Sequence, residues 1–398
     1  MKPLANIRVV DFGQLTAGAN TSAMLADLGA EVIKVESAGF MDLFRSMGNN
    51  GRSIPAWWNR SAQFRFTNRN KRGVALDAKS PEGRRVVQDL IATADVVVEN
   101  FRRGVLERLG LDYASMSARN PRVIFASISS QGETGPYRLH TSFGSTLEAM
   151  GGIAALTGYD GDKPVVTGPH VNYPDQVASL FATGMIITAL REARRTGKGA
   201  LLDMSQRELT SFLIGEEILA ASVNVDRTDL PRTGNSDEAT LLQDCFLASD
   251  GRWIALTLEN SADVERCRAV VGSDEDLADR VAAWCAVRPA SEAADILAAA
   301  GLAAAAVRDG ASLIRERQLA GQTLVWRENG EIVKGRPYGF DGAQLDISRD
   351  APDLGQHTHE VLRDVLGLDE PTIQRLAMLG VTRSEPFEQS ANQQGRPS

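Results

Sequence analysis

Basic side chains crowd one stretch of this sequence and are the first candidates for chemistry. Phosphate groups are bound by hydrogen-bond donors that carry positive charge, which makes Arg and Lys their usual partners in proteins. The stretch therefore favours a phosphate-binding region, although composition by itself is more typical of a solvated basic face. Its members are Arg45, Arg65, Arg69, Lys71, Arg72 and Lys79, followed by Arg102, Arg103 and Arg108.

A single carboxylate, Asp175, opens the longest helix that the sequence predicts, over residues 174–195. Basic residues and Gly197 follow that helix, as is typical of a helix end. By position alone, a carboxylate at a helix start most often stabilises the positive end of the helix dipole. Residue types and spacing thus indicate an α/β enzyme with a phosphate-binding region and no more.

Common nucleotide-binding and catalytic motifs are absent from the sequence. No GxGxxG follows a strand, no GxxxxGK[ST] occurs, and no GxSxG elbow is present. The pair His357 and His359, with Glu360, could bind a metal, but this spacing is a weak signal and we expect no metal site. The remaining histidines are His140 and His170.

Composition limits the function classes. The chain has 398 residues and a net charge of −8, which argues against general nucleic-acid binding. No apolar run reaches the roughly 18 residues of a membrane span, no signal peptide is expected, and the apolar stretch 180–190 predicts a buried helix. The three cysteines, Cys245, Cys267 and Cys285, are too widely spaced for a disulfide framework, so we expect a reducing, cytoplasmic setting.

Strands alternate with helices in the first part of the chain. Strands are predicted at 7–12, 31–36, 95–99 and 122–127, and helices are predicted to begin at Asn20 and at Ser80-Pro81. This alternation predicts βαβ units and a parallel sheet. Ligands bind at the carboxyl ends of such strands. Segments 12–18, 36–45 and 100–103 are therefore expected to lie near one another.

The second part of the chain has a different pattern. A single helix is predicted over 205–222, a linker over 224–240, and a hairpin around Asp250-Gly251. Alanine-rich helices are predicted over 275–305, followed by short helices at 355–366 and 371–379. The polar tail 384–398 is expected to be disordered.

Longer segments carry a resemblance to a known family. They include RVVDFGQLTAG, MLADLGAEVIKVE, the run from NRNKRGVALDAKS through ENFRRGVLERLGLDY, ITALREARRTGKG and PDLGQHTHEVLRDVLGL. In this order and spacing the chain resembles the family III CoA-transferases, the group of formyl-CoA transferase, carnitine CoA-transferase and α-methylacyl-CoA racemase. The resemblance covers nearly the whole chain.

The resemblance implies an architecture. We expect an α/β fold with a Rossmann-like, parallel-sheet large domain made from residues 1–224 and a C-terminal segment, 331–398, that returns to it. A smaller α+β domain is expected at 225–330. The family forms interlocked dimers, so a homodimer of this kind is expected here.

The resemblance also assigns site residues. Asp175, ahead of the helix that ends in the arginine-rich segment 194–199, matches the family's reactive aspartate. The CoA-contacting segments place the following residues at CoA or its thioester: Thr16, Ala17, Leu76, Lys79, Asn100, Phe101, Arg102 and Arg108. Asp77 falls within the same adenine-side motif.

Two departures from the family pattern stand out. Ser37 replaces an arginine that formyl-CoA transferase has directly after the second strand, so Arg45 or Arg102 is expected to supply that phosphate contact. The glycine-rich closing loop is not found after Gly234. The aromatic group Trp57-Trp58, Phe64 and Phe66 is consistent with a bulky acyl group or with core packing.

The chemistry that the resemblance implies is transfer of CoA from an acyl-CoA to a free carboxylic acid. Asp175 would attack the thioester, and an acyl-aspartyl anhydride and an aspartyl-CoA thioester would follow. Backbone N–H groups near 16–18 would stabilise the oxyanions. No metal and no permanently bound cofactor are implied.

Two alternatives remain open. Racemisation or isomerisation of an acyl-CoA needs an acid–base pair, and the family's racemases pair the aspartate with a histidine in a segment that here reads Ser142-Phe143-Gly144. His140 lies three residues too early, which favours transfer. The second alternative is a catalytically silent subunit that scaffolds a partner. The presence of Asp175 argues against it, because such a subunit has no need for that carboxylate.

Overall fold

The computed structural model describes residues 2–47, 54–167, 171–223, 232–272, 276–315, 324–326 and 332–386. Two compact units make up the chain. The first comprises Met1–Gly152, Thr167–Glu216 and Gly321–Ser398, and the second comprises Ile153–Val166 and Glu217–Ala320. The expected domain boundaries at 224/225 and 330/331 stay a prediction for the assembled enzyme.

A six-stranded parallel sheet forms the centre of the first unit, in the order β3-β2-β1-β4-β5-β6. The strand order reverses between β1 and β4, which pair directly from Val9↔Val96 onward. Crevices at such a switch point are the usual ligand sites of α/β sheets. The strands are β1 (Arg8–Asp11), β2 (Glu31–Glu36), β3 (Lys71–Ala75), β4 (Val96–Glu99), β5 (Ile124–Ser129) and β6 (Ala200–Ser205). This confirms the expected α/β fold with a parallel sheet.

Helices cover both faces of the sheet because successive strand residues point to opposite sides. On β1, Val9 belongs to the apolar cluster beneath α1 (Ala17–Asp27) and α9 (Tyr173–Thr196), whereas Val10 belongs to the cluster beneath α3 (Pro81–Ala92). Further helices of this unit are η1 (Leu43–Arg45), η2 (Trp57–Asn59), α2 (Ala62–Thr67), α4 (Val105–Arg108), α5 (Tyr113–Arg119), α6 (Gly144–Gly151) and α10 (Gln206–Phe212), the last of which follows β6.

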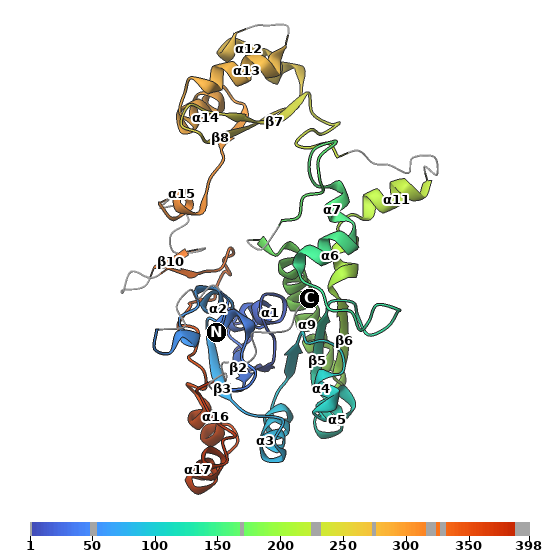
Figure 1. The fold of residues 1–398 in the computed structure, drawn as a ribbon, viewed down its shortest axis with the longest axis vertical. Coiled ribbons are helices and arrows are strands. Elements are labelled where there is room, and N and C mark those ends of the chain that lie inside the picture. The colour runs from blue at the N-terminus through green and yellow to red at the C-terminus, as the bar shows by residue number, and fades with distance from the viewer. Residues whose placement is uncertain are drawn as a thin grey trace, which may run out of the picture. The chain divides into compact units, whose positions relative to one another are not determined.

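The C-terminal segment returns to the first unit. Helices α16 (Thr358–Asp364) and α17 (Glu370–Met378), drawn in red in Figure 1, pack against each other, and α16 packs beside the edge strand β3. Backbone hydrogen bonds fix this contact, since the His357 N–H donates to the Gly73 carbonyl (2.8 Å). A two-stranded sheet, β10 (Leu324–Trp326) with β11 (Ile332–Lys334), precedes these helices.

The second unit is an α+β fold with its own core. Its antiparallel sheet has the order β7-β8-β9, and the β7–β8 hairpin turns at Asp250-Gly251 as predicted. The elements are α7 (Ile153–Leu156), α11 (Gly215–Val223, which begins in the first unit), β7 (Leu242–Leu247), β8 (Trp253–Leu258), α12 (Ser261–Val271), α13 (Leu277–Ala286), α14 (Ala290–Ala299), β9 (Ala303–Ala306) and α15 (Gly310–Arg315).

Some sequence predictions were wrong. Asn20 does not cap a helix: it lies inside α1, where its Nδ2 donates to Oε1 of Gln176 (3.1 Å). The predicted helix 205–222 is divided into α10 and α11. Residues 303–306 form a strand, because this alanine run pairs with β8 along its whole length as an antiparallel neighbour. The linker segment 224–231 and the tail from 387 lie outside the described residues.

The apolar stretch 180–190 is helical, but only one of its faces is buried. Ala182, Ile186 and Leu190 lie in the core, whereas Leu180 is 63% exposed and Met185 is 46% exposed. The expectation of a fully buried helix was therefore wrong for the single chain. No helix in the described ranges is long and apolar enough to cross a bilayer.

Candidate active site

The loops after β1 and β4 meet at the switch point of the sheet. The Asn100 side chain joins them twice: its Oδ1 accepts from the Gln14 N–H (2.7 Å), and its Nδ2 donates to the Gln14 carbonyl (3.0 Å). Gly13 and Gly18 allow the β1–α1 loop to close, since a Cβ on Gly13 would lie 2.4 Å from the Gly18 backbone. The loop thus places the N-terminus of α1 beside Asn100.

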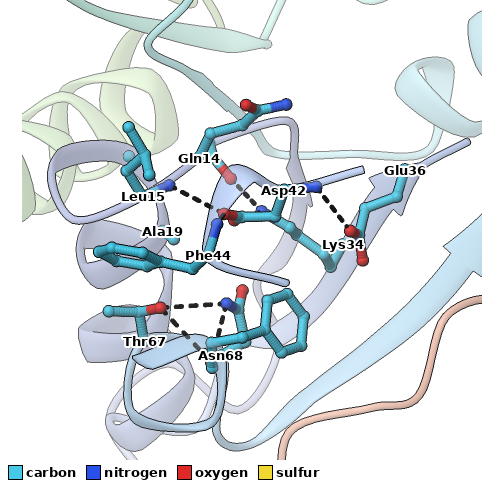
Figure 2. A network of polar contacts seen from close by, with 12 residues as sticks. Gln14, Leu15, Ala19, Lys34, Glu36, Asp42, Phe44, Thr67 and Asn68 are labelled. Atoms are coloured by element: carbon cyan, nitrogen blue, oxygen red, sulfur yellow. Dashed lines mark hydrogen bonds and ion pairs between the residues drawn. The ribbon is translucent and has the colours of Figure 1, made fainter. Parts of the chain in front are cut away.

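A buried network holds this loop from below. The Lys34 ammonium donates to the Gly13 carbonyl and pairs with Asp42 (2.9 Å). The Asp42 carboxylate faces the loop and accepts from the N–H of Leu15 (3.2 Å), as Figure 2 shows. Burial would lower the pKa of Lys34, but Asp42, Asp11 and Glu36 together raise it. A charged Lys34 therefore fixes the shape of the loop.

Arg45 has a structural role, which corrects one expectation. It is fully buried, its Nη2 pairs with Glu36 (2.7 Å), and its guanidinium lies over the Phe64 ring (3.6 Å). Burial tends to raise the pKa of Glu36, but Arg45 overcomes this and lowers it. Arg45 is thus held in the interior by Glu36 and Phe64. It does not replace the phosphate-binding arginine that is absent at Ser37. Phe64 belongs to the core.

The same holds for much of the basic stretch. Lys71 is buried on β3, a strand that its charged residues concealed in the sequence, and pairs with Asp11 (2.8 Å). Further ion pairs of this stretch join Arg69 to Asp27, Arg72 to Glu31 and Glu360, and Arg103 to Glu133 and Asp203. Counting basic residues therefore overstated the phosphate-binding surface, because internal carboxylates neutralise many of them.

Asp175 lies in the first turn of α9, where α9 meets the N-terminus of α1. Asn172 begins the helix in a left-handed conformation (φ 47°), and its Nδ2 lies 3.5 Å from Oγ1 of Thr16. The buried Ser179 hydroxyl lies 3.0 Å from the Ala17 carbonyl and 2.7 Å from that of Asp175. These contacts fix Thr16 and Ala17 beside the start of α9.

Desolvation dominates the electrostatics of Asp175. It raises the pKa of this carboxyl to about 6, against the opposing effect of backbone N–H groups of Ala17 and of Asp175 itself. No ion pair of Asp175 occurs among the described residues. The carboxylate is therefore ionised at neutral pH, more basic than an ordinary aspartate, and stabilised by two helix N-termini rather than by a cation.

Helix α6 approaches the same carboxylate. A Cβ on Gly144 would lie 3.2 Å from Oδ2 of Asp175 and 3.6 Å from Oδ1 of Asn172. The preceding residue, Phe143, is 62% exposed. The segment that matches the racemase histidine motif thus reaches Asp175 through Gly144, and it carries Phe143 in place of a histidine. His140 instead lies against Tyr137, with 5.0 Å between the ring centroids, and His170 lies outside the described residues.

The other expected CoA residues lie along the carboxyl edge of the sheet. The Leu76 side chain is buried in the core, which leaves its backbone for any ligand contact. Lys79 lines a cavity together with Ser37. Phe101 packs edge-on against Phe40 (5.8 Å). Arg102 and Arg108 are exposed on the segment that follows β4.

The histidine pair near the C-terminus makes protein contacts. His357 Nδ1 accepts from the Gly73 N–H (3.1 Å), and its Nε2 lies 2.9 Å from Nη1 of Arg349. His359 pairs with Glu370 (2.8 Å). Within the described ranges, no group of three or more His, Cys, Asp or Glu residues could hold a metal ion.

Sequence reasoning missed two residues that shape the site, Asn172 and Asp42, and named Gly144 only as part of the segment that matches the racemase motif. Asn172 lies two residues before Pro174 and adopts the left-handed conformation, which asparagine tolerates better than most residues. Asp42 reaches the site only through tertiary contacts, so no local signal identifies it.

Comparison with known proteins identifies the family. The model of CoA-transferase family III matches residues 4–358. Succinyl-CoA–D-citramalate CoA-transferase of Chloroflexus aurantiacus is 31% identical, over 96% of this chain and 98% of its own length. Succinyl-CoA:glutarate CoA-transferase of Mus musculus is 30% identical, over 96% of this chain and 90% of its own length.

A solved structure has the same fold. A CaiB/BaiF family protein from Brucella suis superimposes with a TM-score of 0.82 at 29% identity, over 91% of this chain and 99% of that one. The matched family, the relatives that move CoA between acids and the shared fold lead to one conclusion: the chain belongs to CoA-transferase family III, and it is an enzyme of that family.

Proposed function

We propose that this enzyme transfers CoA from an acyl-CoA thioester to a free carboxylic acid, with Asp175 as the nucleophile. The observation that carries the proposal is the setting of Asp175: a partly buried carboxylate with a raised pKa that lies between two helix N-termini. Among the described residues it has no paired cation. Such a group is ionised at neutral pH and is not held in an ion pair, as a carboxylate nucleophile requires.

The reaction begins when an oxygen of the Asp175 carboxylate attacks the thioester carbonyl. The C–S bond breaks, the CoA thiolate leaves, and an acyl-aspartyl anhydride forms. The thiolate then attacks the aspartyl carbonyl, which releases the donor acid as a carboxylate and leaves CoA on Asp175 as a thioester. The acceptor carboxylate runs the same steps in reverse, so that no proton, electron or water is consumed overall.

The loop residues have defined roles in this scheme. The Ala17 N–H orients one oxygen of Asp175, and N–H groups at residues 16–18 stabilise the oxyanion of each tetrahedral intermediate. The Asn100–Gln14 contacts and the Lys34–Asp42 pair keep these groups in place before substrate arrives. Electrostatic stabilisation by fixed donors is often the largest single contribution to catalysis.

CoA itself is proposed to lie along the carboxyl edge of the sheet, from Lys79 and Leu76 past Asn100 and Phe101 to the thioester at Thr16 and Ala17. Arg102 and Arg108 supply positive charge on the segment after β4. We also propose a cytoplasmic homodimer. The exposed apolar face of α9, which includes Leu180 and Met185, supports a partner surface.

Transfer is favoured over racemisation by Phe143. Racemisation requires a second acid–base group across the substrate from Asp175, and the side chain that follows Ser142 at this position cannot exchange protons. Retention of Asp175 in an assembled site argues against a silent subunit.

The test is a transfer assay with succinyl-CoA, the donor named for the relatives, and a panel of free mono- and dicarboxylic acids. We expect new acyl-CoA products and release of succinate in equal amounts. In parallel, a branched acyl-CoA is incubated in D₂O without an acceptor acid. Deuterium uptake at its α-carbon without transfer activity would contradict the proposal and support the racemase.

A further inference from the structure

A small cavity of about 90 Å³ opens at the carboxyl ends of β2 and β3, within the first unit. Its walls come from three segments that are far apart in the sequence: 37–39, 77–79 and 380–383. The volume is well below the several hundred Å³ of a pocket for a whole organic ligand. The cavity therefore suits one compact group rather than a nucleotide base.

Packing of the C-terminal segment fixes one wall of this cavity. The Asp77 N–H donates to the Val381 carbonyl (2.9 Å), and the Val381 N–H donates to Leu376 of α17 (3.0 Å). Val381 is buried in the core of the first unit. The packing of Val381 thus positions Arg383, two residues later, at the cavity. This positioning does not depend on a bound ligand.

The charges around the cavity are those of an anion site. Lys79 and Arg383 bring cations from two segments, and Ser37, Ala38 and Gly39 are small and uncharged, which leaves the space open. The lining carboxylate, Asp77, already accepts from the Lys79 N–H (3.1 Å). Helix α3 begins just beyond Lys79, with Ser80 as its cap, and adds the positive end of a three-turn helix.

We infer that Arg383 binds a phosphate group of the CoA nucleotide, together with Lys79. This rests on the proposed function, which places CoA at Lys79. Arg383 then supplies the charge that is missing at Ser37 and that the buried Arg45 cannot provide. Arginine suits this task because its planar fork donates two parallel hydrogen bonds to phosphate oxygens.

The experiment measures binding of free CoA by titration calorimetry, which requires no turnover. The variants are Arg383→Gln, Arg383→Lys and, as a matched control, Arg375→Gln on the exposed side of α17 outside the cavity. Loss of a charge-assisted hydrogen bond predicts that Arg383→Gln weakens CoA binding about 10- to 100-fold. Arg383→Lys should retain part of the affinity, and Arg375→Gln should match the wild type.

Two further ligands identify which phosphate is bound. If Arg383 contacts the 3′-phosphate, 3′-dephospho-CoA should bind wild type and Arg383→Gln equally. If it contacts the diphosphate, the Arg383→Gln defect should persist with 3′-dephospho-CoA and disappear with pantetheine.

Equal CoA affinity of Arg383→Gln and Arg375→Gln would overturn the inference about Arg383. This result would leave the proposed transfer function intact. Failure of the wild type to bind CoA at all would instead overturn the proposed function. Because Arg383 is exposed, its variants should fold, and unchanged thermal unfolding checks this.

Discussion

Two carboxylates near the carboxyl edge of the sheet have opposite electrostatic settings. Glu36 is buried at the end of β2, and the guanidinium of Arg45 lowers its pKa despite that burial. Asp175 is partly buried at the start of α9, and its pKa rises to about 6 because only backbone N–H groups oppose its desolvation. Burial tends to raise the pKa of both carboxyls, and the presence of a cation decides the net direction.

The difference separates structural from reactive acids. Glu36, Asp42 and Asp11 each pair with a buried cation and together shape the β1–α1 loop. A paired carboxylate is a poor nucleophile because its negative charge is already compensated. Asp175 lies at the start of α9, beside the N-terminus of α1, and has no paired cation among the described residues. Its burial without a cation has a cost in stability that function explains.

The largest effect is expected from Asp175→Asn. The amide retains the shape and the contact with the Ala17 N–H but cannot form an anhydride. Transfer should fall by at least about 10⁴-fold, as for removal of other enzymatic nucleophiles. Steady-state assays with purified variant measure this, and wild-type rates in the variant would remove Asp175 from the chemistry.

Breaking one of the buried ion pairs should mainly lower the stability of the fold. Lys34→Met leaves the Asp42 carboxylate and the Gly13 carbonyl buried without their partner, which should lower the free energy of unfolding by about 3–5 kcal/mol. Denaturant titration measures the loss. The control is Arg119→Ala, which removes an exposed pair with Asp89 and should cost less than about 1 kcal/mol. Equal losses would mean that the buried pair has no special role.

Asp175→Asn should also stabilise the fold. The pKa of Asp175 in the folded protein (about 6) lies above the 3.8 of an ordinary aspartate. The folded state therefore binds the proton more tightly, and stability falls as pH rises through this window. The variant lacks this penalty. Its gain should be absent near pH 3.5 and reach about 1–3 kcal/mol above pH 7, reduced by solvent screening. Denaturant titrations of wild type and variant at several pH values measure this gain in stability. A gain that does not change with pH would mean that the pKa of Asp175 is not raised.

The rate should follow the same titration. Below pH 6 a protonated Asp175 cannot attack, so kcat/KM should drop by about tenfold per pH unit and level off above pH 7. Burial raises the pKa of Glu99, at the end of β4, to about 7, so the profile is repeated with Glu99→Gln. Persistence of the acid limb in that variant assigns it to Asp175, and its disappearance assigns it to Glu99.

Crowding Asp175 should have the smallest effect. Gly144→Ala places a Cβ 3.2 Å from Oδ2, so the carboxylate must shift by a few tenths of an ångström. A loss of about tenfold in kcat is expected, since small misplacements of reacting groups are costly. Gly339→Ala, at an open position, serves as the control and should retain full activity. Equal rates for both variants would show that α6 does not confine the reacting group.

Local sequence patterns predicted much of the large unit. Apolar runs located β2 and β4, Ser80-Pro81 located the start of α3, and Asp250-Gly251 located the hairpin of the second unit. They failed where tertiary contacts overrode the pattern. The sequence did not predict β3, because a buried strand is not expected to contain a lysine unless its ion-pair partner, here Asp11 for Lys71, is known. The alanine run at 303–306 forms a strand because it pairs with the free edge of β8.

The site was predictable only in part. Asp175 and the loop residues Thr16 and Ala17 came from family resemblance, since a carboxylate at a helix start is otherwise unremarkable. Gly144 and Arg383 lie 31 and 208 residues from Asp175 in the sequence, and each matters only through folding. No spacing rule reaches such contacts.

Detection of CoA bound covalently to Asp175 tests the central claim most directly. The enzyme is incubated with succinyl-CoA in the absence of acceptor, quenched in acid, and measured by intact mass and by peptide mapping. We expect a mass increase that corresponds to a CoA thioester, located on the peptide that contains Asp175, abolished in Asp175→Asn and discharged by an acceptor acid. Efficient transfer without any such adduct, or an adduct on another residue, would contradict the account.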